Sequence, residues 1–283
     1  MKILVVTLYS GENEYEQCCE SVHSQVGLDI THVVIENLPN QEAHQKLYKL
    51  FNDSRSKYDY LAKLDADMVF SNQNSLKNIL DKFSDNIDIV SASVHDGITN
   101  SHMQGFNVFS SNCYFHYNTN DALYADQLKI DYTGTHLLYT DHDRNILHAY
   151  NPSPFQAFMF GVHRAMKVMQ YENNYPLINS SFHQKRILYW AYKNSLNNNS
   201  AHATHALVGA TLVLSGDINN ATLYRKSDYL DIFNSINDIN EFLLDKRLKS
   251  DSLISLVRVL GLIRFSLGGF KLLISRVKKR ISH

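Results

Sequence analysis

The chain has 283 residues, with 27 lysines and arginines against 28 aspartates and glutamates, so its formal net charge is −1. A hydrophobic content of 44% and a charged content of 19% are typical of a globular protein and exclude a disordered one. This near-neutral average hides an asymmetry, because seven basic residues and no acidic residue follow Asp251. The first 251 residues therefore carry 20 basic and 28 acidic groups, and an acidic body of this kind is not expected to bind nucleic acid.

The three cysteines, Cys18, Cys19 and Cys113, are an odd number and fit no zinc-binding spacing. They favour a reducing cytoplasm as the compartment of the protein. The apolar run at residues 1–8 is too short for a signal peptide and is interpreted as a buried first strand.

Strand-like and helix-like segments alternate through the first part of the chain. Expected strands are residues 1–8, 31–36, a third that leads into Asp65 and Asp67, and 87–94, and expected helices are residues 12–25, 41–51 and 76–83. This alternation predicts an α/β fold with right-handed crossovers and a mainly parallel, Rossmann-like sheet with flanking helices. Ligands of such sheets bind beyond the carboxyl ends of the strands.

The second half reads as mostly helical. A strand at residues 106–109 and a hairpin of residues 135–140 and 145–150 come first, and Asn151-Pro-Ser-Pro then opens a helix that runs through Met169. Further helices are expected at residues 184–194, 202–214 and 228–244. We therefore divide the chain into a core of residues 1–170, a helical completion of residues 171–250, and a tail of residues 251–283.

The tail is basic and amphipathic. Two apolar helical halves are expected to flank Gly268-Gly269, with Arg264, Lys271 and Lys278 seven residues apart. Such a helix suits an anionic membrane surface, so residues 252–283 predict a cytoplasmic protein lying peripherally on the inner face of a membrane. A helix docked on the domain or in an oligomer is the alternative.

Asp65 and Asp67 lie one residue apart within the apolar run L-D-A-D-M-V-F. If strand geometry continues through them, both side chains leave the same face. Hard oxygen ligands suit Mg²⁺ or Mn²⁺, and two carboxylates among apolar residues are costly to bury without a partner. A polar turn after an edge strand is the other interpretation.

Over about residues 1–170 the chain resembles the nucleotide-sugar glycosyltransferases of the GT-A fold. The resemblance depends on V-V-T-L-Y-S-G-E, on L-D-A-D-M-V-F and on the segment L-H-A-Y-N-P-S-P-F-Q-A-F-M-F-G-V-H-R-A. It implies a nucleoside site at Thr7, Tyr9 and Glu12, a base-reading Glu36, and Mn²⁺ or Mg²⁺ held on the diphosphate by Asp65, Asp67 and a late histidine. His148 is the first candidate for that histidine, and His95 and His163 are the alternatives.

Chemistry adds two further expectations. Lys63, just before the motif, can neutralise phosphate charge in the donor site, although a solvated strand-end lysine is an equal reading. An inverting enzyme needs a carboxylate base. In the inverting members of the family that this chain resembles, a Glu-Asp pair often supplies it, and this chain has no such pair at that point. The candidates Asp126, Asp131, Asp141 and Asp143 stay open, as does the choice between inversion and retention.

The predicted function is metal-dependent transfer of a sugar from a UDP or GDP donor to a cell-surface glycan or a lipid-linked acceptor. Leu64–Val69 also fits the D-x-D-x-[TV] pattern of haloacid-dehalogenase-like phosphatases, but two strand–helix units precede it here. A non-catalytic, membrane-associated protein with a GT-A fold is the third reading.

Overall fold

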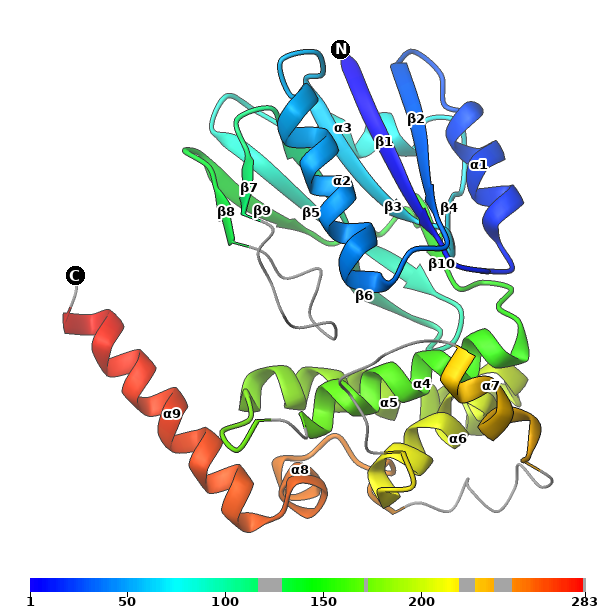
Figure 1. Ribbon diagram of the computed structural model, residues 1–283, viewed down its shortest axis with the longest axis vertical. Coiled ribbons are helices and arrows are strands. Elements are labelled where there is room, and N and C mark those ends of the chain that lie inside the picture. Colours follow the sequence, from blue (N-terminus) through cyan, green and yellow to red (C-terminus); the bar gives the residue numbers. More distant parts are fainter. Residues whose placement is uncertain (117–128, 171–172, 219–226, 237–245, 282–283) are drawn as a thin grey trace. The chain divides into compact units, whose positions relative to one another are not determined.

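The computed structural model describes residues 1–116, 129–170, 173–218, 227–236 and 246–281, and for residues 227–228 and 275–281 it describes the backbone alone. The chain forms two compact units, Met1–Ser153 and Pro154–His283 (Figure 1). The helix α4 (Pro154–Met169) therefore belongs to the second unit, whereas the sequence analysis placed it with the core. Asp126 and residues 237–244 of the last expected helix lie outside the described residues.

The first unit contains a mixed eight-stranded sheet. In order, its strands are β2 (Asp29–Glu36), β1 (Lys2–Tyr9), β3 (Tyr60–Asp65), β6 (Ser101–Ser110), β5 (Ile87–Asp96), β10 (Ile146–His148) and β4 (Met68–Phe70), with β9 (Thr135–Tyr139) beside β5. Strands β2, β1 and β3 are parallel to one another, and β5 is parallel to β9 and β10; β6 runs antiparallel between β3 and β5. The α/β prediction with a mainly parallel sheet is confirmed, and the carboxyl ends of β1, β2, β3, β5 and β10 lie along one edge.

The helices α1 (Tyr15–His23), α2 (Asn40–Ser54) and α3 (Ser75–Leu80) connect these strands. The expected apolar stripe of α2 is buried, with Leu47 and Phe51 wholly inaccessible. Leu4 and Val6 of β1 pack in the same core cluster as these side chains. Because Ile3 and Val5 are buried as well, β1 is covered on both faces, which explains its continuous apolar sequence.

The expected hairpin of residues 135–140 and 145–150 is wrong. Strands β9 and β10 both pair in parallel with β5, on the edge that β6 leaves open, so they follow one another in the same direction. A turn at Asp141 separates them: its backbone N–H donates to Ser93 Oγ (2.8 Å), and its carboxylate accepts from the N–H of Asn145 (2.7 Å). The polar residues 141–144, which were expected to form a hairpin loop, instead connect two strands that run in the same direction beside β5.

A two-stranded sheet of β7 (Tyr114–His116) and β8 (Lys129–Asp131) completes the described strands of the first unit.

The second unit is helical in its described part, as predicted. After α4 come α5 (Ile178–Asn198), α6 (Ala201–Ser215), α7 (Ser227–Asn234), α8 (Leu253–Leu260) and α9 (Leu262–Ile281). Helices α4 and α6 approach closely at two glycines. A Cβ on Gly161 would lie 1.7 Å from the carbonyl oxygen of Ala206, and one on Gly209 would lie 2.2 Å from that of Phe158.

The tail breaks at a different glycine from the one expected. Gly261, with φ of 78°, separates α8 from α9, whereas Gly268 and Gly269 lie inside α9. Within the described residues no single helix is long and apolar enough to cross a membrane; α8 and the first part of α9 meet that test together, but they are bent by 116°.

Gly161→Ala should destabilise the second unit by about 1–3 kcal/mol, because the new methyl group overlaps the backbone of α6. Gly269→Ala is the matched control, since it is also a helix-interior glycine but has nothing within 4 Å of its Cβ position. This control should stabilise α9 by about 0.5–1 kcal/mol. Urea unfolding followed by circular dichroism measures both, and equal effects would contradict the close packing at Gly161.

Candidate functional site

Five of the described strands that share a direction have their carboxyl ends at one edge of the sheet, and each of these five ends in a polar or aromatic side chain. Tyr9 closes β1, Glu36 closes β2, Asp65 closes β3, Asp96 closes β5 and His148 closes β10. These residues are distant in sequence, and the sheet alone brings their strand ends to one edge. This is the edge at which ligands bind in open α/β sheets.

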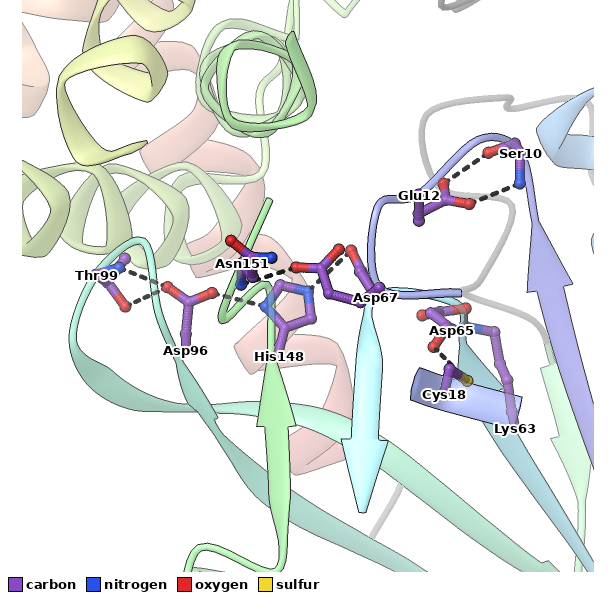
Figure 2. Close-up of polar contacts among 11 residues, drawn as sticks. Ser10, Glu12, Cys18, Lys63, Asp65, Asp67, Asp96, Thr99, His148 and Asn151 are labelled. Carbon is purple, nitrogen blue, oxygen red and sulfur yellow. Dashed lines mark hydrogen bonds and ion pairs between the residues drawn. The ribbon is translucent and has the colours of Figure 1, made fainter. Parts of the chain in front are cut away.

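The centre of the site is a row of three side chains in contact, Asp96, His148 and Asp67 (Figure 2). His148 Nδ1 lies 2.6 Å from Asp96 Oδ2, and its Nε2 lies 3.5 Å from Asp67 Oδ2. The other oxygen of Asp96 accepts from the backbone N–H and the hydroxyl of Thr99, both at 2.6 Å. Nδ1 of His148 therefore hydrogen-bonds to Asp96, and Nε2 faces Asp67.

Asp67 is electrostatically strained. Burial raises its pKa to about 6, and the negative charges of Asp65 and Glu12 add to this effect, while His148 opposes it. Among the described residues, Asp67 Oδ1 is a buried oxygen without a hydrogen-bond partner. Such an oxygen carries a desolvation cost that a cation would remove.

Asp65 has a different environment. Lys63 Nζ donates to Asp65 Oδ1 at 2.6 Å, and the Lys63 side chain is only 9% exposed. Burial alone would raise the pKa of Asp65, but the charge and hydrogen bond of Lys63 outweigh it, so the pKa is lowered. The neighbouring carboxylates are thus shifted in opposite directions.

The expectation that both aspartates leave one strand face is wrong. Strand β3 ends at Asp65, and Ala66 and Asp67 form a turn before β4. Figure 2 shows Asp65 beside Lys63 and Asp67 directed towards His148. In the described part of the chain, no group of three or more His, Cys, Asp or Glu side chains is arranged to hold a metal ion.

The residues expected at the nucleoside site divide into two groups. Tyr9 stacks on Tyr15, with ring centroids 3.9 Å apart, and Tyr15 donates its hydroxyl hydrogen to Glu36 (3.1 Å). Glu12 accepts from the backbone N–H and hydroxyl of Ser10, at 2.6 and 2.7 Å, which shapes the loop after β1. These side chains are at the strand edge.

Thr7, by contrast, is fully buried, and its Oγ1 lies 2.9 Å from His32 Nε2. Burial lowers the pKa of His32 to about 4, so this imidazole is neutral at pH 7. Any influence of the Thr7 side chain on a ligand would therefore be exerted from inside the fold.

The candidates for the catalytic base are scattered. Asp131, on β8, accepts from His116 (2.6 Å) and is about half exposed. Asp141 is buried, and its carboxylate accepts hydrogen bonds within its own turn, one of them from the backbone N–H of Asp143 (3.2 Å). The identity of the base stays a prediction.

The alternatives to His148 lie elsewhere. His95 precedes Asp96 on β5, and its ring centroid is 5.3 Å from that of His102. His163 is on α4, in the second unit. Of the three histidines, His148 is the one whose ring nitrogen faces an aspartate of the D-A-D motif.

Two site residues were missed by the sequence analysis. The expected strand ended at residue 94, and Asp96 was given no role in the metal site. The extension of β5 to Asp96 depends on its pairing with Ser101 and His148. Tyr15 was taken as an ordinary helical residue. The sequence did carry a signal for Tyr15, because Tyr9 and Tyr15 flank a short loop that contains Gly11, and such a loop can bring two aromatic rings together.

Asp67→Asn and Asp65→Asn should change stability in opposite directions. Asp67 has a raised pKa in the fold, so its ionisation destabilises the fold as pH rises from 3.8 through about 6. Asp67→Asn should therefore increase the free energy of unfolding at pH 7 by about 1–3 kcal/mol, with little effect below about pH 4. Asp65→Asn should decrease it at pH 7, because the lowered pKa of Asp65 marks a net stabilising charge.

Urea unfolding at pH 4 and pH 7 in the absence of divalent metal tests this pair of variants. A loss of stability on Asp67→Asn at pH 7 would contradict the strained environment of Asp67.

No protein-family model matches this chain, and no curated protein matches it. In fold, it is similar to solved glycosyltransferase structures. One is the mannosyltransferase PcManGT of Pyrobaculum calidifontis in complex with GDP-Man and Mn²⁺, which is 11% identical over 90% of this chain and 86% of that chain, with a TM-score of 0.40. Another is TarS of S. aureus, 13% identical over 88% of this chain and 90% of that chain, with a TM-score of 0.34. Because these sequence identities and TM-scores are low, the functional inference depends on the side chains of the site.

Proposed function

We propose that this protein is a metal-dependent glycosyltransferase, which moves a sugar from a nucleoside-diphosphate donor to a cell-surface glycan or a lipid-linked acceptor. The observation that carries the proposal is the buried Oδ1 of Asp67, which has no hydrogen-bond partner among the described residues and lies beside His148 at the edge where β1, β2, β3, β5 and β10 end. An anionic oxygen and an imidazole nitrogen at that edge are the donors that a divalent cation requires.

The donor set fits Mn²⁺ or Mg²⁺. Asp67 and the Nε2 of His148 would hold the ion, and Asp65 would join after exchanging its contact with Lys63. A mixed carboxylate and imidazole site suits Mn²⁺ better than Mg²⁺, which prefers oxygen and water. The bound cation would neutralise charge on the diphosphate leaving group without proton transfer.

The protein's own residues would orient the donor. Lys63 places a positive charge next to Asp65, where it would reach a phosphate once Asp65 turned to the cation. The stacked rings of Tyr9 and Tyr15 offer an aromatic surface for a nucleobase, and Glu36, held by the Tyr15 hydroxyl, offers an acceptor for base or ribose donors.

The first test is metal-dependent nucleotide binding. Calorimetry should show that UDP or GDP binds in the presence of Mn²⁺ and that binding is lost in Asp67→Asn and His148→Ala, because each change removes a metal donor. Electron paramagnetic resonance of Mn²⁺ should show the same loss without any nucleotide. Asp53→Asn, in an exposed pair with Lys49, is the matched control and should bind as the unmodified protein does.

Binding of nucleotide that is indifferent to Mn²⁺ and to both variants would overturn the proposal. Hydrolysis of simple phosphomonoesters without a sugar nucleotide would favour the phosphatase reading instead. Metal-dependent binding with no sugar transfer or donor hydrolysis would favour the non-catalytic one.

Asp96 should act as a positioning residue for the metal. It contacts His148 and not the proposed ion, so Asp96→Asn should weaken Mn²⁺ binding about 10–100-fold while leaving the donors in place. Asp88→Asn is a closely matched control, since Asp88 is also buried on β5 and accepts hydrogen bonds from Ser110 and the backbone of Gly134. Asp88→Asn should lower stability but leave Mn²⁺ affinity unchanged; equal losses of affinity would contradict the role of Asp96.

A further inference from the structure

Helices α8 and α9 expose an unusual concentration of apolar side chains. Among the described residues, seventeen large apolar side chains are exposed, and seven of them lie within the 22 residues from 253 to 274. These are Leu253, Ile254, Leu262, Ile263, Phe270, Leu273 and Ile274. Ile263 is 76% exposed and Phe270 63%, values that a core-facing helix of a soluble domain does not show.

Helix α9 is docked on its own unit by a different face from the one that carries Ile263, Phe270 and Ile274. The guanidinium of Arg264 donates to the backbone carbonyl oxygens of Met169, Gln170 and Asn173, at 2.6, 2.8 and 3.1 Å. One turn later, a Cβ on Gly268 would lie 2.4 Å from the carbonyl oxygen of Pro176. Two contacts four residues apart define the docked face.

Three exposed apolar residues of α9, Ile263, Phe270 and Ile274, form a stripe along the helix. Ile263, Phe270 and Ile274 are seven and four residues apart, which places them on one face of α9. The sequence continues this spacing with Val277 and Ile281. The apolar face therefore points away from the helices to which α9 is anchored.

The charge of this segment restricts what can cover the stripe. After Asp251 the sequence has seven basic residues and no acidic one, and Arg258 and Lys271 are exposed among the described side chains. A second copy packed symmetrically through this face would bring two such basic segments together without a compensating acid. A surface that is negatively charged and apolar beneath satisfies both features.

We propose that α8 and α9 form a docking surface for an anionic lipid bilayer, with Ile263, Phe270 and Ile274 inserted at the boundary between headgroups and acyl chains. The basic side chains then meet lipid phosphates. The bend of 116° between α8 and α9 spreads the apolar residues over two helices, which suits a helix pair lying in the plane of an interface (Figure 1). This proposal does not depend on the glycosyltransferase assignment.

The test is co-sedimentation of the full chain with phosphatidylcholine vesicles, with and without phosphatidylglycerol. The chain should partition at least about tenfold more strongly onto the anionic vesicles, and added salt should weaken the binding. Lys271→Gln should lower partitioning about fivefold, and Phe270→Glu more than about tenfold. Leu196→Glu is the matched control, because Leu196 is 59% exposed on α5 but lies outside the stripe, and it should partition as the unmodified chain does.

Three results would overturn the proposal. The chain could remain in the supernatant with anionic vesicles, or Phe270→Glu and Leu196→Glu could have equal effects. Light scattering could instead show a dimer that Phe270→Glu dissociates, which would assign the stripe to a second copy. Circular dichroism of each variant verifies folding, and Mn²⁺-dependent nucleotide binding without vesicles tests the proposed function separately.

Discussion

The hydrogen bond between Asp96 and His148 is the contact on which the arrangement of the site depends. It joins the ends of two parallel strands, β5 and β10, and it turns the imidazole so that Nε2 faces Asp67. Asp96 is completely buried, and Thr99 donates to its second oxygen, so the carboxylate that orients His148 is itself held in place. This hydrogen bond adds to the burial of His148 in holding the imidazole in the orientation that faces Asp67.

The two aspartates of the D-A-D motif show how the fold distributes electrostatic cost. Lys63 lies on β3 and neutralises Asp65 locally, so that carboxylate stabilises the fold. Asp67 lies in the following turn, beyond that lysine, and is left with a raised pKa and an oxygen that has no partner among the described residues. The cation proposed for this site would relieve that electrostatic strain.

Local sequence patterns predicted much of the fold, because each depends on contacts with near neighbours. The stripe through Leu47 and Phe51 predicted α2, and the apolar run of β1 predicted a strand covered on both faces. The patterns failed where a partner distant in sequence decided the outcome. Pairing with β5 made β9 and β10 successive parallel strands. Gly268, where a break was expected, lies inside α9 and close to the backbone of Pro176.

By itself, the sequence determined the alternation of strands and helices, the two carboxylates at and just after the end of β3, and the basic apolar tail, because composition and spacing are properties of the chain. Only the tertiary structure decided that Asp96 orients His148, that Asp65 and Asp67 diverge, and which face of α9 is exposed. The physical reason is that these features depend on hydrogen bonds and steric contacts between residues up to about a hundred positions apart, such as Arg264 and Met169. Periodicity along the chain carries no information about such pairs.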